Sequence, residues 1–138
     1  MQHKILETVI YSDDLDAVRK FYEDLLELPL LSAEPGRHLF FRLGNSMLLV
    51  FDPKNTRNAT VKVGDQTIPR HGADGACHLA LEVAQNQIQT LKSRLIANGV
   101  EIESEIDWPG GGHSVSFRDP AGNSIEFATR ELWFKDSP

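Results

Sequence analysis

The sequence predicts an α+β fold in which two β-α-β-β-β modules form curved mixed sheets around a concave site. Apolar and polar residues alternate with a period of two at residues 77–83 and 123–129, as they do in strands with one buried face. Apolar residues also recur at helical spacing once in each half of the chain. The order of these signals is the same in both halves, and an internal repeat constrains a fold more strongly than a single motif does.

The first module is expected at residues 5–52. Its first strand is the β-branched run at 5–11, and Asp13 or Asp14 can cap the helix that follows. This helix should end before Pro29, because proline cannot continue it. The remaining strands are expected at 29–33, 37–43 and 46–51, with a tight turn at Gly44 and Asn45.

The second module is expected at residues 76–130 and repeats this order. A strand at 77–83 precedes a helix that carries Ile88, Leu91 and Leu95 and ends at the αL pair Asn98 and Gly99. Further strands are expected at 100–105, 113–118 and 123–129, the last two joined by the turn sequence Asp-Pro-Ala-Gly. A polar linker (53–75, with a short strand at 60–63) and a tail (131–138) complete a single domain of 138 residues.

The two modules can be aligned residue by residue. Phe41 and Arg42, followed by Gly-Asn-Ser at 44–46, match Phe117 and Arg118, followed by Gly-Asn-Ser at 122–124. This alignment places Glu7 against His78, and Leu48 against Glu126.

Composition narrows the class of protein. A net charge of −6 and a pI near 5.3 argue against binding to nucleic acid or to anionic membranes, which need clustered Lys and Arg. The first residues lack the apolar stretch of a signal peptide, and the single Cys77 cannot form an internal disulfide, so a cytoplasmic location is expected. Cys77 itself is expected in the core, on the side of its strand that faces the helix.

The strand alternation predicts that His78 and Glu126 lie on the face opposite the helix. An imidazole and a carboxylate brought together there can bind a divalent metal. The ordinary alternative is that His78 is a hydrogen-bonded interior histidine and that Glu7, on the first strand, is a partly exposed strand carboxylate.

The paired modules, the strand HLALEV and the closing segment DPAGNSIEF resemble the vicinal oxygen chelate superfamily. This superfamily includes glyoxalase I, bleomycin- and fosfomycin-resistance proteins, methylmalonyl-CoA epimerase and extradiol dioxygenases. The resemblance implies a metal held by Glu7, His78 and Glu126, with Leu48 where glyoxalase I has a fourth ligand, Glu. It implies a divalent ion, Mn, Fe, Zn, Ni or Mg, and the two carboxylates favour the harder of these ions.

The same alternation predicts that six other side chains point toward the substrate: His38, Phe40, Arg42, Ser114, Ser116 and Arg118. Leu48, from its alignment with Glu126, and Trp108, from its glycine-rich loop, are also expected to meet the substrate. The two arginines suit an anionic substrate, or else they pair with Glu82 or reach solvent. His71 and His113 are expected in loops, where each could act as an acid or base, and Trp108 with its neighbouring glycines could form a mobile flap.

Two functions follow from the resemblance. The first is a metal-dependent lyase, isomerase or dioxygenase whose small polar or anionic substrate chelates the ion through two oxygens. The alternative is a drug-binding protein without chemistry, of the bleomycin-resistance kind. The apolar tail residues Leu132, Trp133 and Phe134 predict a homodimer, because a lone domain rarely exposes such a patch.

Overall fold

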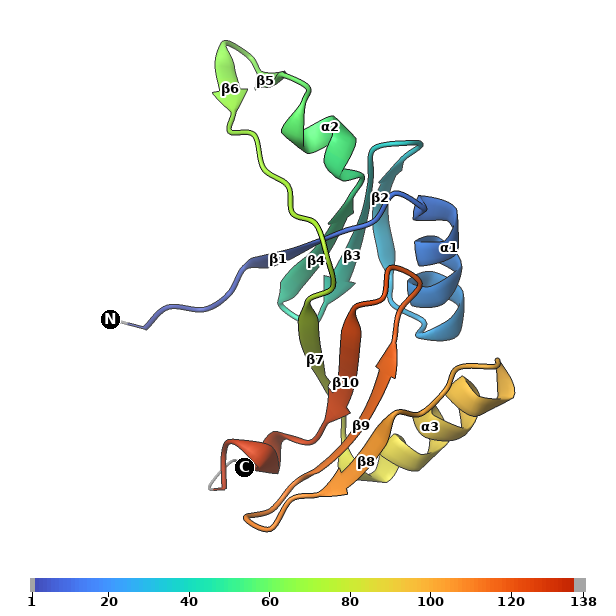
Figure 1. Ribbon diagram of the computed structural model, residues 1–138. Helices are drawn as coiled ribbons and strands as arrows, with labels where there is room; N and C mark the ends of the chain where they lie inside the picture. Colours follow the sequence, from blue (N-terminus) through green and yellow to red (C-terminus); the bar gives the residue numbers. More distant parts are fainter. Residues whose placement is uncertain (1, 136–138) are drawn as a thin grey trace. The chain divides into compact units, whose positions relative to one another are not determined.

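The computed structural model describes residues 2–135, and the chain divides into two compact units, Met1–Gly75 and Ala76–Pro138 (Figure 1). Each unit contains a four-stranded mixed sheet with a helix against one side, so the predicted α+β fold of two similar modules is confirmed. No helix within residues 2–135 is long and apolar enough to cross a membrane.

Unit one holds the first module. Its elements are β1 (Glu7–Tyr11), α1 (Leu15–Arg19), the π-helix η1 (Lys20–Leu25), β2 (Leu30–Glu34), β3 (His38–Leu43) and β4 (Ser46–Phe51). The sheet order is β1-β4-β3-β2, in which β1 pairs with β4 in parallel and the other neighbours are antiparallel. Asp14 caps α1 as predicted, since its carboxylate accepts a hydrogen bond of 3.1 Å from the amide of Ala17.

The core of unit one lies between this helix and the sheet. Tyr22 is fully buried, and its ring centroid is 5.8 Å from that of Phe41 on β3. Phe41 pairs directly with Leu48 on β4, and both of these side chains are also fully buried. Because paired residues point to the same side of a sheet, Leu48 faces the helix.

Unit two repeats the arrangement. Its elements are β7 (His78–Glu82), the 3-10 turn η2 (Gln85–Gln87), α3 (Ile88–Ala97), β8 (Ser104–Asp107), β9 (His113–Arg118), β10 (Ser124–Ala128) and the 3-10 turn η3 (Arg130–Leu132). The sheet order is β7-β10-β9-β8, with β7 and β10 parallel. Gly99 ends α3 at φ +79°, as the αL pair predicts.

The core of unit two lies on the α3 side of its sheet, where Phe117 and Phe127 have ring centroids 4.9 Å apart. Two expectations fail in this unit. The strand expected at 100–105 begins only at Ser104, because the amide of Val100 still bonds to the carbonyl of Leu95 at the helix end. Cys77, expected in the core, is exposed just before β7 begins.

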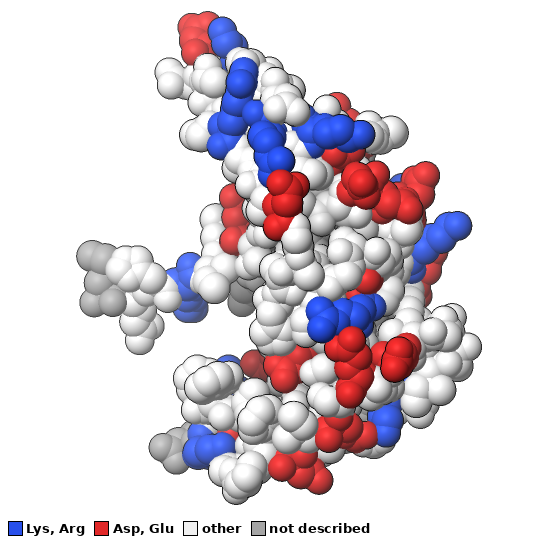
Figure 2. Space-filling view, in the orientation of Figure 1, with Lys and Arg blue, Asp and Glu red and all other residues white. Residues whose placement is uncertain are grey.

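The linker is more ordered than its composition indicates. It forms α2 (Pro53–Arg57) and a hairpin of β5 (Val61–Val63) and β6 (Gln66–Ile68). Only β5 was expected, since α2 depends on the side chain of Asp52 as its N-cap, bonded to the amide of Lys54 at 3.0 Å. Basic side chains gather over this part of the molecule (Figure 2); they are Lys54, Arg57, Lys62 and Arg70.

His113 is the first residue of β9, and it is not the loop acid or base that the sequence suggested. Its Nε2 lies 2.7 Å from Glu105, and its Nδ1 contacts Asp107 on the neighbouring β8. Lys92 and Gln89 of α3 donate to the same Glu105 and lower its pKa to about 2. His113 therefore ties β8 to β9 on the side of the sheet that carries α3.

This contact predicts a pH dependence of stability. The hydrogen bond to Asp107, and then that to Glu105, raises the pKa of His113 above its ordinary value of 6.5. The stabilisation should be complete below about pH 6.5 and should be lost as the pH rises through the raised pKa. The urea midpoint of the wild type should therefore fall as the pH is raised above about 6.5.

The urea midpoint of the His113→Gln variant should fall less over the same pH range, because glutamine does not titrate there. Burial lowers the pKa of His38, so its titration acts only below pH 6.5 and does not contribute in this window. Equal slopes for the two proteins would show that the protonated imidazole contributes nothing.

Candidate metal site

Each sheet has one face turned away from its helix, which we call the open face. In unit two it carries the side chains of His78, Ala80, Glu82, Ser114, Ser116, Arg118, Ser124, Glu126 and Ala128. In unit one it carries those of Glu7, Val9, Tyr11, His38, Phe40, Arg42, Met47, Leu49 and Phe51. Exposure alternates along β7, and Leu79 and Leu81 are more buried than their neighbours, as the period of two predicts.

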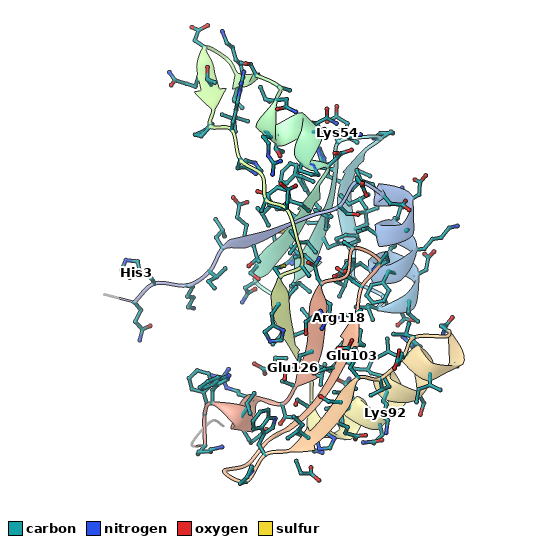
Figure 3. All side chains as sticks on the ribbon, in the orientation of Figure 1. His3, Lys54, Lys92, Glu103, Arg118 and Glu126 are labelled. Carbon is teal, nitrogen blue, oxygen red and sulfur yellow. The ribbon has the colours of Figure 1, made fainter. Side chains whose placement is uncertain are left out.

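His78 and Glu126 come together on the open face of unit two, where Figure 3 labels Glu126. The Nε2 atom of His78 lies 3.7 Å from Oε1 of Glu126, and the two side chains are 59% and 13% exposed. The Nδ1 atom of His78 lies 3.0 Å from the main-chain carbonyl oxygen of Ser124. A carbonyl can only accept, so Nδ1 donates this hydrogen bond and Nε2 is the ring nitrogen that faces the carboxylate.

This geometry fits a divalent metal. A metal-binding histidine commonly donates its second nitrogen to a carbonyl or carboxylate, which fixes the ring and its tautomer. Two atoms that each lie about 2.1 Å from one ion are roughly 3.0 to 3.4 Å apart, so a small rotation of either side chain brings 3.7 Å into this range. The spacing of His78 and Glu126 is therefore compatible with two ligands of one ion.

The third predicted ligand, Glu7, is an exposed residue at the start of β1 and belongs to unit one. Within either unit, no third His, Cys, Asp or Glu among residues 2–135 joins such a pair in a metal-binding group. The ligand set of Glu7, His78 and Glu126 thus stays a prediction, and His78 with Glu126 is the part that one unit assembles.

Leu48 was expected on the open face as the counterpart of Glu126, and this is wrong. The strand register pairs Glu7 with Met47 in unit one and His78 with Ser124 in unit two. If Glu7 corresponds to His78, Leu48 corresponds to the core residue Ile125, and Leu49 corresponds to Glu126. The position that corresponds to the fourth ligand is therefore still occupied by a leucine, but by Leu49 and not by Leu48.

The two arginines of the open face have partners of their own. Arg118 donates through Nε to both carboxylate oxygens of Glu103, at 3.0 and 3.1 Å, and through Nη1 to the carbonyl of Gly122 (Figure 3). Arg42 donates to the carbonyl of Gly44 at 2.8 Å. Neither of them pairs with Glu82, which lies 3.3 Å from Arg130. Arg118 therefore forms an ion pair with Glu103 at the rim of its sheet.

Ser116 and Trp108 lie on the open face near Glu126. Ser116 pairs directly with Glu126 across β9 and β10, and the indole Nε1 of Trp108 donates to Oγ of Ser114 at 2.9 Å. The loop that carries Trp108 closes on itself through two hydrogen bonds, from Trp108 N to Gly112 O and from Gly111 N to Trp108 O. These contacts describe a structured turn that holds the indole against β9.

The open face of unit one is aromatic. The ring of His38 stacks on Phe40 at 3.8 Å, and its Nε2 lies 3.0 Å from Oγ of Ser32. Burial, and then the nearby Arg37, lowers the pKa of His38, so this imidazole is neutral at pH 7.

Sequence reasoning missed one pair on this face. The hydroxyl of Tyr11 lies 2.6 Å from Nδ1 of His71, which comes from the linker and packs edge-on against Phe51 at 5.1 Å. The strand period could have placed Tyr11, which lies four residues from Glu7 on the same face of β1. No local signal brings His71 to it, because that contact spans 60 residues.

Comparison with known proteins gives the family. The model of the Glyoxalase/Bleomycin resistance protein/Dioxygenase superfamily matches residues 4–127. No curated protein matches the chain. The chain is 39% identical to a structure described as lactoylglutathione lyase from Agrobacterium tumefaciens, with a TM-score of 0.87 over 96% of this chain and 98% of that one.

More distant structures share the fold alone. One described as a glyoxalase/bleomycin resistance protein/dioxygenase from Nocardioides is 24% identical, with a TM-score of 0.69 over 99% of this chain and 87% of that one. Another, described as oxidase ChaP-H2, is 21% identical, with a TM-score of 0.64 over 94% of this chain and 95% of that one. The resemblance noted from the sequence is thereby confirmed, and the chain belongs to the Glyoxalase/Bleomycin resistance protein/Dioxygenase superfamily.

Proposed function

We propose that this protein is a metal-dependent enzyme of the glyoxalase type, in which Glu7, His78 and Glu126 hold a divalent ion. The observation that carries the proposal is the His78–Glu126 pair, 3.7 Å apart, with the imidazole oriented by the carbonyl of Ser124. The 39% identity to a protein described as a lactoylglutathione lyase supports the same class of reaction.

The ion, when bound, supplies Lewis-acid chemistry to two neighbouring oxygens of a small substrate. The protein's own groups set the conditions for it. The Ser124 carbonyl accepts a hydrogen bond from Nδ1 of His78, which orients the ring and leaves Nε2 as the nitrogen available to the ion. The two carboxylates balance the charge of a dication, and their oxygens favour a harder ion such as Mn²⁺, Fe²⁺ or Mg²⁺.

Leucine at position 49 leaves the proposed site with three protein ligands. A site with three protein ligands keeps positions open for substrate oxygens, which both isomerisation and oxygen activation require. Half-buried Ser116, the direct neighbour of Glu126, can donate a hydrogen bond at this point of the open face. We also propose a homodimer formed through the apolar tail.

Removing His78 tests the site directly. Wild-type protein purified without an affinity tag that binds metal should contain a divalent ion, and His78→Ala should not, because two carboxylates alone are too few ligands. Added Mn²⁺ at about a hundred times its Kd should raise the melting temperature of metal-free wild type by roughly 10 °C and leave His78→Ala unchanged. Elemental analysis and thermal unfolding measure both effects.

His3→Ala is the matched control, since His3 is also exposed and lies before the first strand. It should keep the metal and the shift in melting temperature. Wild-type protein with no metal and no shift for Mn²⁺, Fe²⁺ or Zn²⁺ would overturn the enzyme proposal. The second candidate, a drug-binding protein without chemistry, would then lead, and the stacked His38 and Phe40 on an aromatic face favour it.

A further inference from the structure

A cavity lies at one end of the open face of unit two, and the proposed metal site does not use it. Its volume is about 150 Å³. Ala80 and Ala128 form its floor, and Leu132, Trp133 and Phe134 of the tail form its wall. The cavity exists because two strand positions carry alanine at the place where the tail passes over them. We call it the tail pocket.

The wall of the tail pocket is held in place by its own contacts. Arg130 lies 3.3 Å from Glu82 on β7, and its guanidinium stacks at 4.5 Å over the ring of Phe134. The amides of Trp133 and Phe134 both donate to the carbonyl of Arg130, at 3.1 and 3.0 Å. The pocket is thus preformed, with one charged pair at its edge.

The floor of the pocket adjoins Glu126. Ala80 pairs directly with Glu126, and Ala128 follows it by two residues on the same face of β10. Residues two apart in a strand are separated by about 7 Å. A group in the tail pocket would therefore sit about one ring's length from the carboxylate that we propose as a metal ligand.

We propose that the tail pocket receives a ring-sized apolar group of the substrate whose two oxygens bind the metal. An apolar cavity of about 150 Å³ is large enough to hold benzene, and the lining of alanine, leucine and aromatic side chains suits such a group. Trp133 and Phe134 line the pocket with one part of their surface, and the rest of these exposed side chains stays available for the proposed dimer contact. The substrate class is an aryl-substituted compound with oxygens on adjacent atoms.

This inference rests on the proposed function for the position of the oxygens, but the pocket itself is a separate feature. The superfamily model matches only residues 4–127, so the wall of the pocket lies beyond the matched part of the chain. The tail would thereby give this chain a preference among substrates that the common scaffold does not determine.

Two hydroxy acids that differ only in their side group test the inference. Mandelate and lactate carry the same carboxylate and hydroxyl oxygens, with a phenyl group in the first and a methyl group in the second. The Mn²⁺-loaded protein should bind mandelate about 10- to 100-fold more tightly than lactate, measured by calorimetry. Ala128→Leu should fill the pocket and abolish this preference while lactate binds as before. Ala97→Leu makes the same change on the exposed side of α3 and should keep the preference.

The outcomes separate the pocket from the metal. Equal affinities for the two acids in wild type, or a preference that survives in Ala128→Leu, would overturn the inference and leave the metal proposal standing. If neither acid needs Mn²⁺ to bind, the proposed function fails. Benzyl alcohol, which cannot chelate a metal, then tests whether the pocket alone binds an aromatic ring. Saturation-transfer NMR should show that it binds metal-free wild type and not Ala128→Leu. A Trp133→Ala, Phe134→Ala double variant that turns a dimer into a monomer yet keeps the mandelate preference would overturn the inference and show that the tail serves self-association alone.

Discussion

Leu48→Glu should unfold the protein, whereas Leu49→Glu should leave it folded with a new carboxylate on the open face of unit one. Leu48 is fully buried and lies opposite Phe41, which packs against Tyr22 of the helix. A carboxylate there would be buried among apolar side chains, which costs several kcal/mol whether it is charged or becomes protonated. This is a large part of the roughly 5–15 kcal/mol that stabilises an ordinary domain.

Leu49 points the other way, beside Phe40 and Val9, and it is 8% exposed. Its replacement should cost less, about 1–3 kcal/mol, and added Mn²⁺ should recover part of that loss if the new carboxylate joins the metal site. Urea unfolding followed by circular dichroism, with and without Mn²⁺, measures both variants. Leu49→Gln is the matched control, because it has nearly the same shape without the charge. A stable Leu48→Glu protein would show that the faces of β4 are wrongly assigned here.

Gly112→Ala should destabilise unit two and release its tail. Gly112 has a φ of +92°, and a Cβ atom on it would lie 2.6 Å from the backbone nitrogen and 2.8 Å from the Cα of Leu132. The positive φ alone costs an L-residue about 1–2 kcal/mol. The close approach to backbone atoms adds to this, since only movement of η3 can relieve it. We expect a total loss of about 3 kcal/mol or more in the free energy of unfolding.

Gly122→Ala separates the two terms. Gly122 has a similar φ of +84°, but a Cβ atom there would meet nothing within 4 Å, so only the backbone strain remains. Limited proteolysis should cut Gly112→Ala near residues 130–135 and leave Gly122→Ala resistant there. The tail pocket should also be lost in the first variant and kept in the second. Equal destabilisation of the two variants would mean that the contact between Gly112 and Leu132 contributes nothing.

Local chemistry in the sequence accounts for much of the fold. The cap at Asp14, the turn at Gly99 and the strand alternation of 77–83 each act over a few residues, and the structure contains all three. His78 and Glu126 were assigned to one face for the same reason, because a period of two is visible within a single strand.

The error at Leu48 has an equally physical cause. Residues 47–51 of β4 are all apolar, so no alternation marks which side faces the helix. Aligning the glycine turns of the two modules shifts this strand by one residue, because Leu43 pairs with Ser46 in one turn and Arg118 pairs with Ser124 in the other. A shift of one residue moves every side chain of a strand to the opposite face. The pairing of β4 with β1 and β3 settles the question, and pairing between distant strands is not encoded locally.

The parallel pairing of β7 with β10 has a consequence for the order of folding. The atoms that orient the proposed metal ligand, Nδ1 of His78 and the carbonyl oxygen of Ser124, belong to residues 46 positions apart in the sequence. Helices and hairpins form from near neighbours, but a parallel pair must first close the whole intervening loop, which slows it. β10 also pairs with β9, so α3 and the β9–β10 hairpin can form before β7 docks. The His78–Glu126 pair would then be among the last contacts to appear during refolding, and the uptake of metal would report the completed unit and not its intermediates.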